Sequence, residues 1–581
     1  MQKKTKIFNE SVHKADYEDF YDSKKLDHNG YIFDRFRDKE SLNGIWRFEA
    51  DPFNTCIRAK WYLEEEKDDK GFFNAIDYSF DDWDSIKVPS CWNTEAERYY
   101  LYEGIAVYTR VFICRKKIGE RVFLKFGAVA NEAKIFVNGN YLGKHVGAST
   151  PFFVEITDVL RERNRIIVVV DNTRRAESLP AENFDWFNYG GIHRSIEILR
   201  LPETFIKRFD VALKRDGTFS NIEIRIEIDG PDKNGKAEVR IPELNLSIAV
   251  PVKNRKGKIC VTSHPELWRL EKPKLYEVTC VFGNDVVRDR VGFREISVSA
   301  LDILLNGEKI VLRGIAKHED SVQNGRSLTE DEMSEDITLA KELGCNLIRL
   351  SHYPHNEKLA QLADENGILL WEEIPAYWAI AFNCEATCID AENQLREAIL
   401  RDHNRASVMA WCVCNENLDT DERLAFAKRM IRIVRETAAH CLVTAACMMD
   451  YDACEVCDRL SKYVDIISVN EYYGWYQNDI EGLPKMLESL RAVMDRPAVV
   501  SEFGADGGPK FRGFYDEKGT EDCQAYVYKR QVKELAEASF LSGTIAWVLY
   551  DFRTPRRLHM SQRQNPKLKY YNTKGVLSAD K

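Results

Sequence analysis

The chain has 581 residues, of which 44% are hydrophobic, 11% aromatic and 30% charged, and its formal net charge is −10. This length predicts about two to four domains. The negative charge argues against nucleic acid as a partner, because phosphate binding needs a basic face. No apolar run reaches the roughly 18 residues of a membrane-spanning helix.

The first residues, "MQKKTKIFNESVHKADYED", contain no apolar core of signal-peptide length. The fifteen cysteines form neither a disulfide framework nor a zinc motif, since Cys454-x-x-Cys457 has no second pair of ligands at zinc-finger distance. Others, such as Cys260 and Cys412, lie within apolar runs. This usage is typical of a reducing compartment, and we expect a cytoplasmic protein.

The first 300 residues or so are rich in short β-branched or alternating runs separated by turn residues. Those before residue 202 are "GIWRFEA", "VYTRVFICR", "RVFLKF", "AKIFVNG" and "NRIIVVVDN". They predict a β-sandwich or barrel over residues 1–201. A second set, "FDVALKR", "NIEIRIEID", "KAEVRIP" and "LYEVTCVF", predicts an immunoglobulin-like sandwich over residues 202–298.

From residue 299 the pattern changes to strands that alternate with helices. Eight strand candidates are "KIVLRGIAKHE", "NLIRLSHYP", "GILLWEEIP", "VMAWCVCNE", "CLVTAACMMD", "DIISVNEYY", "PAVVSEFG" and "TIAWVLYDF". One intervening helix begins with a capping box from Thr329 to Glu332. Eight such units over residues 299–581 favour a closed (β/α)8 barrel. An open doubly wound sheet usually carries a Gly-rich phosphate loop, and neither such motif occurs.

Acids and amides end nearly every strand of this barrel, at the face where barrel active sites lie. They are Glu319, Glu372, Glu373, Asn415, Glu416, Asp450, Asn470, Glu471, Glu502 and Asp551. Aromatic residues flank them, and carboxylates among aromatics suit a sugar ring. Two carboxylates across a glycosidic bond can hydrolyse it, but the pattern does not select the pair. Alternation along the strand predicts that Cys412, Cys414 and Glu416 share one face.

Two segments narrow the choice of the catalytic carboxylates. "NLIRLSHYP" and "RDHNRASVMAWCVCNE" resemble the two signature segments of glycoside hydrolase family 2, over nearly the whole chain. The resemblance implies a sugar-binding-like jelly-roll sandwich (1–201), an immunoglobulin-like sandwich (202–298) and a catalytic TIM barrel (299–581). It also implies that Glu416, after the fourth strand, is the acid/base, and that Glu502, in "SEFG" after the seventh, is the nucleophile.

The mechanism that this resemblance implies is retaining, with a covalent glycosyl-enzyme intermediate and carboxyl groups about 5 Å apart. Glu416 must be protonated and Glu502 ionised in the resting enzyme. In the family, the residue at Asn415 bonds the 2-hydroxyl of the sugar.

A motif near the C-terminus indicates which sugar the substrate carries. Asn572-x-Lys574 resembles the Asn-x-Lys motif with which the family's β-glucuronidases hold the substrate carboxylate. The same correspondence adds further substrate-binding candidates: Asp185, His318, Asn470, Tyr472, Tyr476 and Trp547. The resemblance therefore implies removal of a terminal β-linked glucuronic acid.

The sequence also departs from the family pattern. Leu568 occupies the position of an arginine usual in β-glucuronidases, and Glu471 replaces another arginine in "NEYYGWY". Basic candidates for a substitute cation are Arg553, Arg556, Arg557, Arg563, Lys567 and Lys569. A β-galacturonidase therefore stays open, as does a β-galactosidase. The connection after "WEEIPAY" is short and predicts an open mouth for larger aglycones.

Two readings lie outside this class of enzyme: a non-catalytic carbohydrate-binding protein, and a metal-dependent hydrolase using His318 and His352. The presence of both glutamates argues against the first, and the family's use of these histidines argues against the second. We expect no cofactor and no metal. The expected partner is a small-molecule or oligosaccharide β-uronide, without nucleic acid or membrane. By resemblance, we expect a homo-oligomer, a tetramer.

Overall fold

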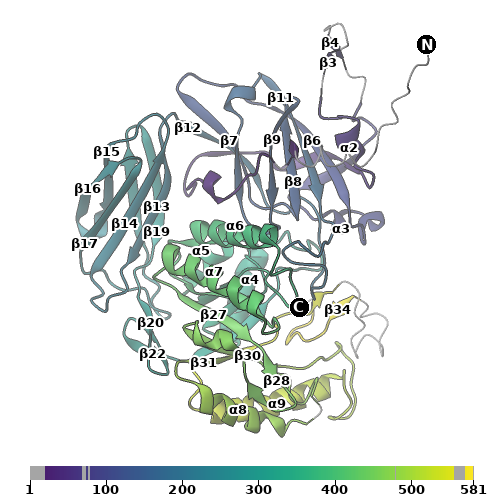
Figure 1. The fold of residues 1–581 in the computed structure, drawn as a ribbon, viewed down its shortest axis with the longest axis vertical. Helices are drawn as coiled ribbons and strands as arrows, with labels where there is room; N and C mark the ends of the chain where they lie inside the picture. Colours follow the sequence, from purple (N-terminus) through teal and green to yellow (C-terminus); the bar gives the residue numbers. More distant parts are fainter. Residues whose placement is uncertain are drawn as a thin grey trace. The chain divides into compact units, whose positions relative to one another are not determined.

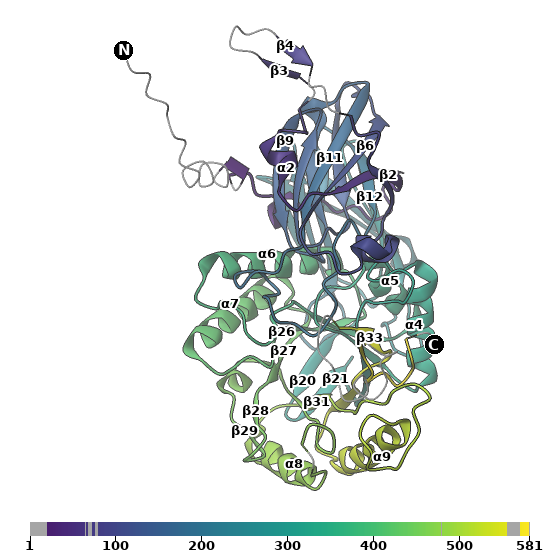
Figure 2. The same cartoon turned by 90° about the vertical axis from the view of Figure 1, so that its right-hand side faces the viewer.

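The computed structural model describes residues 20–21, 23–63, 65–67, 73–75, 79–477, 479–554 and 570–579 (Figures 1 and 2). Within these ranges no helix is both long and apolar enough to cross a membrane. Contacts divide the chain into two compact units. The first comprises 1–31, 38–173 and 190–203, and the second 32–37, 174–189 and 204–581. The predicted domain boundaries stay a prediction.

The first unit is a sandwich of two antiparallel sheets. The strands of one sheet are, in spatial order, β1 (Lys39–Ser41), β12 (Ile196–Pro202), β7 (Glu120–Phe126) and β10 (Phe152–Glu155). Those of the other sheet are β5 (Asp84–Val88), β2 (Gly44–Ala50), β6 (Ile105–Ile113), β11 (Arg163–Asp171), β8 (Glu132–Val137) and β9 (Asn140–Val146). Shorter elements are β3 (Glu65–Lys67), β4 (Phe73–Ala75), α2 (Thr55–Arg58), α3 (Trp92–Glu95), η1 (His28–Gly30), η2 (Glu97–Tyr99) and η3 (Thr157–Val159). Apolar side chains from both sheets form one buried core between them.

The second unit begins with an immunoglobulin-like antiparallel sheet. Its strands, in spatial order, are β13 (Phe205–Leu213), β14 (Asn221–Asp229), β17 (Lys256–Thr262), β16 (Leu246–Lys253), β15 (Gly235–Ile241), β18 (Tyr276–Phe282) and β19 (Asp285–Val291). The turn η4 (Pro242–Leu244) connects β15 to β16. A small sheet of β20 (Ile296–Ser299), β21 (Asp302–Leu305) and β22 (Glu308–Ile310) follows the seven strands. Buried residues alternate with exposed ones along β19, as expected for a strand with one face in the core.

Eight parallel strands then close into a barrel, which confirms the predicted (β/α)8 fold and all eight strand candidates. They are β23 (Leu312–Lys317), β24 (Leu347–Leu350), β25 (Leu369–Glu373), β26 (Val408–Asn415), β27 (Leu442–Cys447), β30 (Ile466–Asn470), β31 (Ala498–Glu502) and β32 (Gly543–Ala546). Short strands beyond their carboxyl ends are β28 (Met449–Asp450), β29 (Glu455–Val456), β33 (Phe552–Arg553) and β34 (Tyr571–Asn572).

Helices cover the outside of the barrel. They are α4 (Glu330–Glu342), α5 (Glu357–Asn366), α6 (Glu385–Asp402), α7 (Asp421–Thr437), α8 (Gly482–Val493), α9 (Glu521–Glu537) and the single turn η5 (Arg459–Lys462). The predicted capping box is present at the start of α4, where Thr329 and Glu332 each bond the other's backbone N–H. In both views α8 and α9 lie next to each other.

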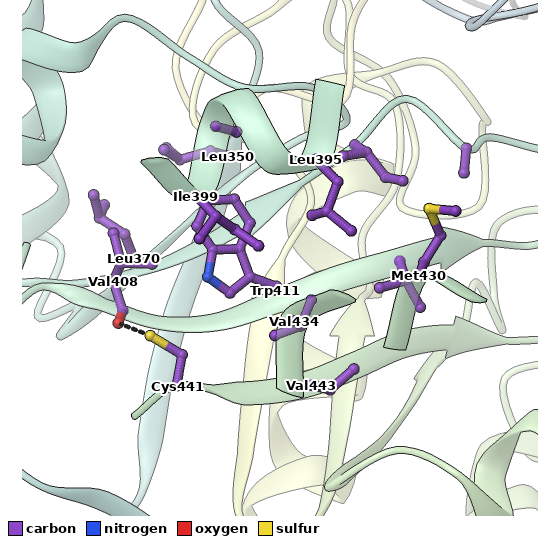
Figure 3. Close-up of a cluster of buried hydrophobic side chains, with 14 of the residues drawn as sticks. Leu350, Leu370, Leu395, Ile399, Val408, Trp411, Met430, Val434, Cys441 and Val443 are labelled. Atoms are coloured by element: carbon purple, nitrogen blue, oxygen red, sulfur yellow. Dashed lines mark hydrogen bonds between the residues drawn. The ribbon is translucent and has the colours of Figure 1, made fainter. Parts of the chain in front are cut away.

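Figure 3 shows how the fourth and fifth strands pack against the helices outside them. Trp411 and Val443 point toward side chains of α6 and α7, among them Ile399 and Val434. At the amino end of the strands, the Cys441 thiol donates to the Val408 carbonyl over 3.3 Å. This apolar layer fixes β26 and therefore the residues at its carboxyl end.

One prediction for β26 is wrong. Cys412 packs inside the barrel, whereas Cys414 packs in the layer between strand and helices, so they do not share a face. The register of β26 against β27 shifts between Cys412 and Asn415. Such a bulge breaks the strict alternation on which the prediction depended.

Candidate active site

A cavity of about 270 Å³ opens at the carboxyl ends of the barrel strands. Its lining is rich in carboxylates and aromatic rings. The lining residues are Asp185, His352, Tyr377, Trp378, Glu416, Tyr451, Tyr472, Tyr476, Gln477, Glu502, Trp547, Asn572 and Lys574. Both predicted catalytic glutamates thus face one cavity.

Glu502 is the last residue of β31 and is held by two donors. Arg349 Nη1 donates to its Oε1 over 2.7 Å, and the Tyr472 hydroxyl donates to its Oε2 over 2.7 Å. His352 Nε2 lies 3.9 Å from Oε1. Hydrogen bonds from a cation and a hydroxyl therefore fix the orientation of the Glu502 carboxyl group.

Arg349 extends this network to a second carboxylate. It lies in β24, fully buried, and its Nε donates to Glu373 Oε1 over 2.6 Å. His352 Nδ1 lies 2.9 Å from the other oxygen of Glu373. Burial opposes ionisation of Glu373, but the charge of Arg349 and the contact with His352 outweigh it and lower the pKa of Glu373 to about 2. The guanidinium therefore holds two carboxylates in one fixed geometry.

Glu416 follows β26 directly and has different surroundings. Its backbone adopts φ +51°, a left-handed conformation that is uncommon outside glycine. Trp378 Nε1 donates to its Oε2 over 3.0 Å. Burial and the nearby charge of Glu502 raise the pKa of Glu416 to about 7, despite hydrogen bonds from Trp378 and Asn470. A carboxyl group of this pKa can give and take a proton near neutral pH.

Asn415 and Asn470 lie behind the two glutamates and do not line the cavity. Arg349 Nη2 donates to Asn415 Oδ1 over 2.7 Å, which fixes the orientation of the amide. Among the described residues, Asn415 Nδ2 is buried without a hydrogen-bond partner. Asn470 Oδ1 accepts a hydrogen bond from the Ser501 hydroxyl at 2.8 Å.

Lys574 provides a positive charge at the cavity wall. Its Nζ lies 3.0 Å from Asp506 Oδ1, and both side chains are buried. Burial opposes the ammonium charge, but Asp506 and Tyr476 outweigh it and raise the pKa of Lys574. Asn572 Oδ1 accepts from the Lys574 backbone N–H at 3.1 Å, and its Nδ2 donates to Asp185 Oδ2 over 3.3 Å. Among the described residues lining the cavity, Lys574 is the one lysine or arginine.

Aromatic rings complete the walls. The rings of His352 and Trp547 stack with centroids 5.0 Å apart, and those of Tyr377 and Trp378 stack at 4.5 Å. Tyr476 is 56% exposed. Stacked rings around carboxylates are the environment that we expected for a sugar ring.

Most of the predicted site residues line this cavity: Asp185, Glu416, Tyr472, Tyr476, Glu502, Trp547, Asn572 and Lys574. His318 does not. It is buried, its ring lies 4.1 Å from that of Phe552, and its Nδ1 is 3.3 Å from the Tyr353 hydroxyl. The sequence assigned no site role to Arg349, Tyr377, Trp378, Tyr451 or Gln477. Arg349 had a usable signal, a charged residue inside an apolar strand.

Arg553, a candidate to replace the arginine that the family has at the position of Leu568, forms hydrogen bonds outside the cavity. It donates to the Tyr189 hydroxyl over 2.8 Å, to the Val322 carbonyl over 2.6 Å and to the Tyr571 hydroxyl over 3.2 Å. It does not line the cavity. Leu568 and the other candidates, Arg556, Arg557, Arg563, Lys567 and Lys569, lie outside the described residues.

Family comparisons agree with this architecture in all three parts of the chain. Residues 39–202 match the model "Glycosyl hydrolases family 2, sugar binding domain", residues 204–294 match "Glycosyl hydrolases family 2", and residues 296–526 match "Glycosyl hydrolases family 2, TIM barrel domain".

Individual relatives cover nearly the full chain. A β-glucuronidase of Paenibacillus borealis is 28% identical over 89% of this chain and 91% of its own. The structure of a β-glucuronidase from an uncultured Clostridium species superposes with a TM-score of 0.81 at 26% identity, covering 95% of this chain and 96% of that one. A β-galacturonidase from Eisenbergiella tayi, solved with galacturonate, gives a TM-score of 0.78 at 25% identity, covering 94% and 96%.

Proposed function

The chain belongs to glycoside hydrolase family 2, and we propose that it is a retaining exo-glycosidase that removes a terminal β-linked glucuronic acid. The observation that carries this proposal is the cavity that Glu416 and Glu502 share, with Lys574 on its wall. That the chain is a glycosidase follows from the family. The mechanism, the residue roles and the sugar are the proposal.

In the first step, a Glu502 oxygen attacks the anomeric carbon and the glycosidic bond breaks. Glu416 gives its proton to the departing oxygen, leaving a covalent glycosyl-enzyme. In the second step, Glu416 takes a proton from water, which attacks the same carbon and releases Glu502. The pKa of about 7 at Glu416 supports the acid/base role. The two donors that hold the Glu502 carboxyl group in place support its role as the nucleophile.

Substrate recognition in this proposal uses the remaining walls. Lys574 and Asn572 bind the C6 carboxylate, and Asp185 binds sugar hydroxyls. Asn415 does not line the cavity, but its Nδ2, which is buried without a hydrogen-bond partner among the described residues, is the donor that we assign to the 2-hydroxyl. Tyr472, Tyr476 and Trp547 enclose the ring, Asn470 supports Glu416, and His318 supports the aromatic wall.

A second candidate is β-galacturonidase activity. The similar Eisenbergiella tayi protein carries that name, and an ammonium group binds a carboxylate whatever the configuration at C4. A third, β-galactosidase activity, gives Lys574 no anionic partner on the substrate.

The test is a panel of 4-nitrophenyl β-glucuronide, β-galacturonide and β-galactoside, assayed with the wild-type protein and with Lys574→Ala. We expect the glucuronide to be cleaved fastest. Lys574→Ala should reduce kcat/KM for uronides by about 10²-fold, because a buried charged hydrogen bond is lost, and should leave weak activity on the neutral galactoside unchanged. Faster cleavage of galacturonide would select the second candidate. An equal loss on all three sugars would refute the role of Lys574.

We further propose a homotetramer without a cofactor, by the family resemblance, and a cytoplasmic location, from the cysteine usage. All fifteen cysteines are free thiols, which supports a reducing compartment. Light scattering that gives the mass of a monomer, or recovery of the protein from the culture medium, would contradict these two points.

A further inference from the structure

Trp378 contacts Glu416, although no pattern in the sequence indicates a role for Trp378. It lies in the connection 374–384 between β25 and α6, half-buried, and lines the cavity. Its indole Nε1–H donates to Glu416 Oε2 over 3.0 Å. An indole N–H can only donate, so this contact needs a free oxygen on the carboxyl group.

The backbone around Trp378 is bonded to the segment that carries Glu416. Trp378 N–H donates to Asn415 O over 3.0 Å, and Asn415 N–H donates to Ala376 O over 2.9 Å. Asn417 Nδ2 donates to Trp378 O over 2.6 Å. Bonds on both sides of Glu416 therefore tie the connection to the end of β26.

Both contacting residues have left-handed backbones, with φ +52° at Trp378 and φ +51° at Glu416. This conformation is disfavoured for side chains of this size and persists only where the surroundings enforce it. Strained positions of this kind occur at active sites and ligand-binding sites. Here the two positions aim an indole and a carboxyl group at each other.

One face of the Trp378 ring is covered by Tyr377, stacked at 4.5 Å and 26°. The ring remains partly exposed and borders the cavity beside Glu416. Because an acid donates its proton to the departing oxygen, the group beside that acid lies next to the leaving group.

We propose that Trp378 is a positioning residue, which holds the Glu416 carboxyl toward the glycosidic oxygen by its N–H and provides the first surface that the leaving group contacts. This inference rests on the proposed role of Glu416 as acid/base. Beyond that role, it implies that the 374–384 connection affects which leaving groups the protein accepts.

The N–H of Trp378 acts on Glu416 together with several other groups. Those facing Glu416 are Glu502, Arg349, Asn470, Tyr377, Tyr451 and Tyr472. The Trp378 bond favours the ionised form and opposes burial and the charge of Glu502. Removing this donor alone must therefore raise the pKa of Glu416.

The experiment compares wild type with Trp378→Phe, which keeps a ring without a donor, and Trp378→Leu, which removes both. The substrates are aryl uronides, of the sugar that the wild type cleaves, with phenol and 4-nitrophenol as leaving groups. In the wild type, the basic limb of kcat/KM should lie near pH 7. Trp378→Phe should move it upward by about 0.5–1 pH unit.

Comparing leaving groups distinguishes a loss of proton donation by Glu416 from a general loss of activity. Trp378→Phe should lower kcat/KM by about tenfold for the phenyl uronide, whose poor leaving group needs the acid, and by about twofold or less for the 4-nitrophenyl uronide. Trp378→Leu should in addition raise KM for a naphthyl uronide by about threefold relative to Trp378→Phe.

The outcomes distinguish this inference from the proposed function. A wild-type protein that cleaves no glycoside, or a Glu416→Ala variant as active as the wild type, would refute the proposed function. The inference fails by itself if folded Trp378→Phe, checked by circular dichroism, keeps the wild-type basic limb and leaving-group dependence. Should Trp378→Phe not fold, Asn417→Ala removes the 2.6 Å bond to Trp378 O from outside the cavity. An unshifted limb in that variant overturns the inference equally.

Discussion

Glu502 and Glu416 face the same cavity, but the two sides of that cavity differ in charge. Around Glu502, a buried guanidinium and a hydroxyl donate to the carboxylate. Around Glu416, the nearest donors are neutral, and burial together with the charge of Glu502 raises its pKa to about 7. The contrast shows how one cation in direct contact with Glu502 makes the surroundings of two carboxyl groups in a single cavity unlike.

Replacing each glutamate should break the comparison most severely. We expect Glu502→Ala to lower kcat by about 10⁶-fold and Glu416→Ala by about 10²–10⁴-fold. Azide should partly rescue both, with opposite stereochemistry. In Glu502→Ala it attacks the substrate directly and gives the inverted glycosyl azide, whereas in Glu416→Ala it attacks the glycosyl-enzyme and gives the retained product. NMR of the azide products reads the configuration. Identical configurations would contradict the assigned roles, and wild-type rates in either variant would reject them.

Removing the cation should make the two sides alike. Arg349→Met leaves Glu373 and Glu502 as buried charges without their partner, so we expect unfolding to become easier by about 3–5 kcal/mol. We expect kcat/KM to fall by about 10²–10³-fold. Urea unfolding and steady-state kinetics measure the two effects.

The barrel offers a matched control for Arg349. Arg423 is equally buried and pairs with Asp458 at 2.7 Å, but it does not line the cavity or contact either glutamate. Arg423→Met should therefore destabilise the protein by a similar amount and leave kcat of the folded fraction unchanged. If both variants lose activity equally, Arg349 acts through stability alone, and the electrostatic contrast drawn above is wrong.

The sequence was a good guide to this site where local pattern decides the structure. Each barrel strand is an apolar run with a polar end, so the eight strands and the places of Glu416 and Glu502 could be predicted from the chain itself, and resemblance then selected the pair. Contacts made across the fold could not be predicted in this way. Arg349 meets Glu502 from another strand, and the bulge before Asn415 depends on pairing with β27. Trp378 contacts Glu416 from another connection, with a left-handed backbone that no local pattern in the sequence indicates.

Glu471 tests the comparison from outside the cavity, with the smallest expected effect. Burial raises the pKa of this residue to about 8, yet it does not line the cavity. Its Oε2 accepts from Tyr473 N–H at 2.9 Å, and the nearby Gln531 amide, whose Nε2 donates to Tyr473 O over 3.0 Å, partly opposes the rise in the pKa of Glu471. A raised pKa by itself is therefore no mark of a catalytic acid in this protein. Orientation into the cavity is needed as well.

Glu471→Gln separates these two requirements, because it imitates the protonated acid and cannot ionise. The native state keeps the Glu471 proton up to about pH 8, while the unfolded chain releases it near the ordinary value of 4.5. Wild-type stability from this group is thus present below pH 4.5 and is lost as the pH rises through 8. We expect Glu471→Gln to raise the thermal midpoint by about 2–4 °C at pH 8, with little change at pH 5, while the basic limb of kcat/KM stays in place. Glu342→Gln, at an exposed position, is the control and should change neither. A shift of the basic limb of kcat/KM in Glu471→Gln would mean that the ionisation of Glu471 affects catalysis. The assignment of that limb to Glu416 alone would then be wrong.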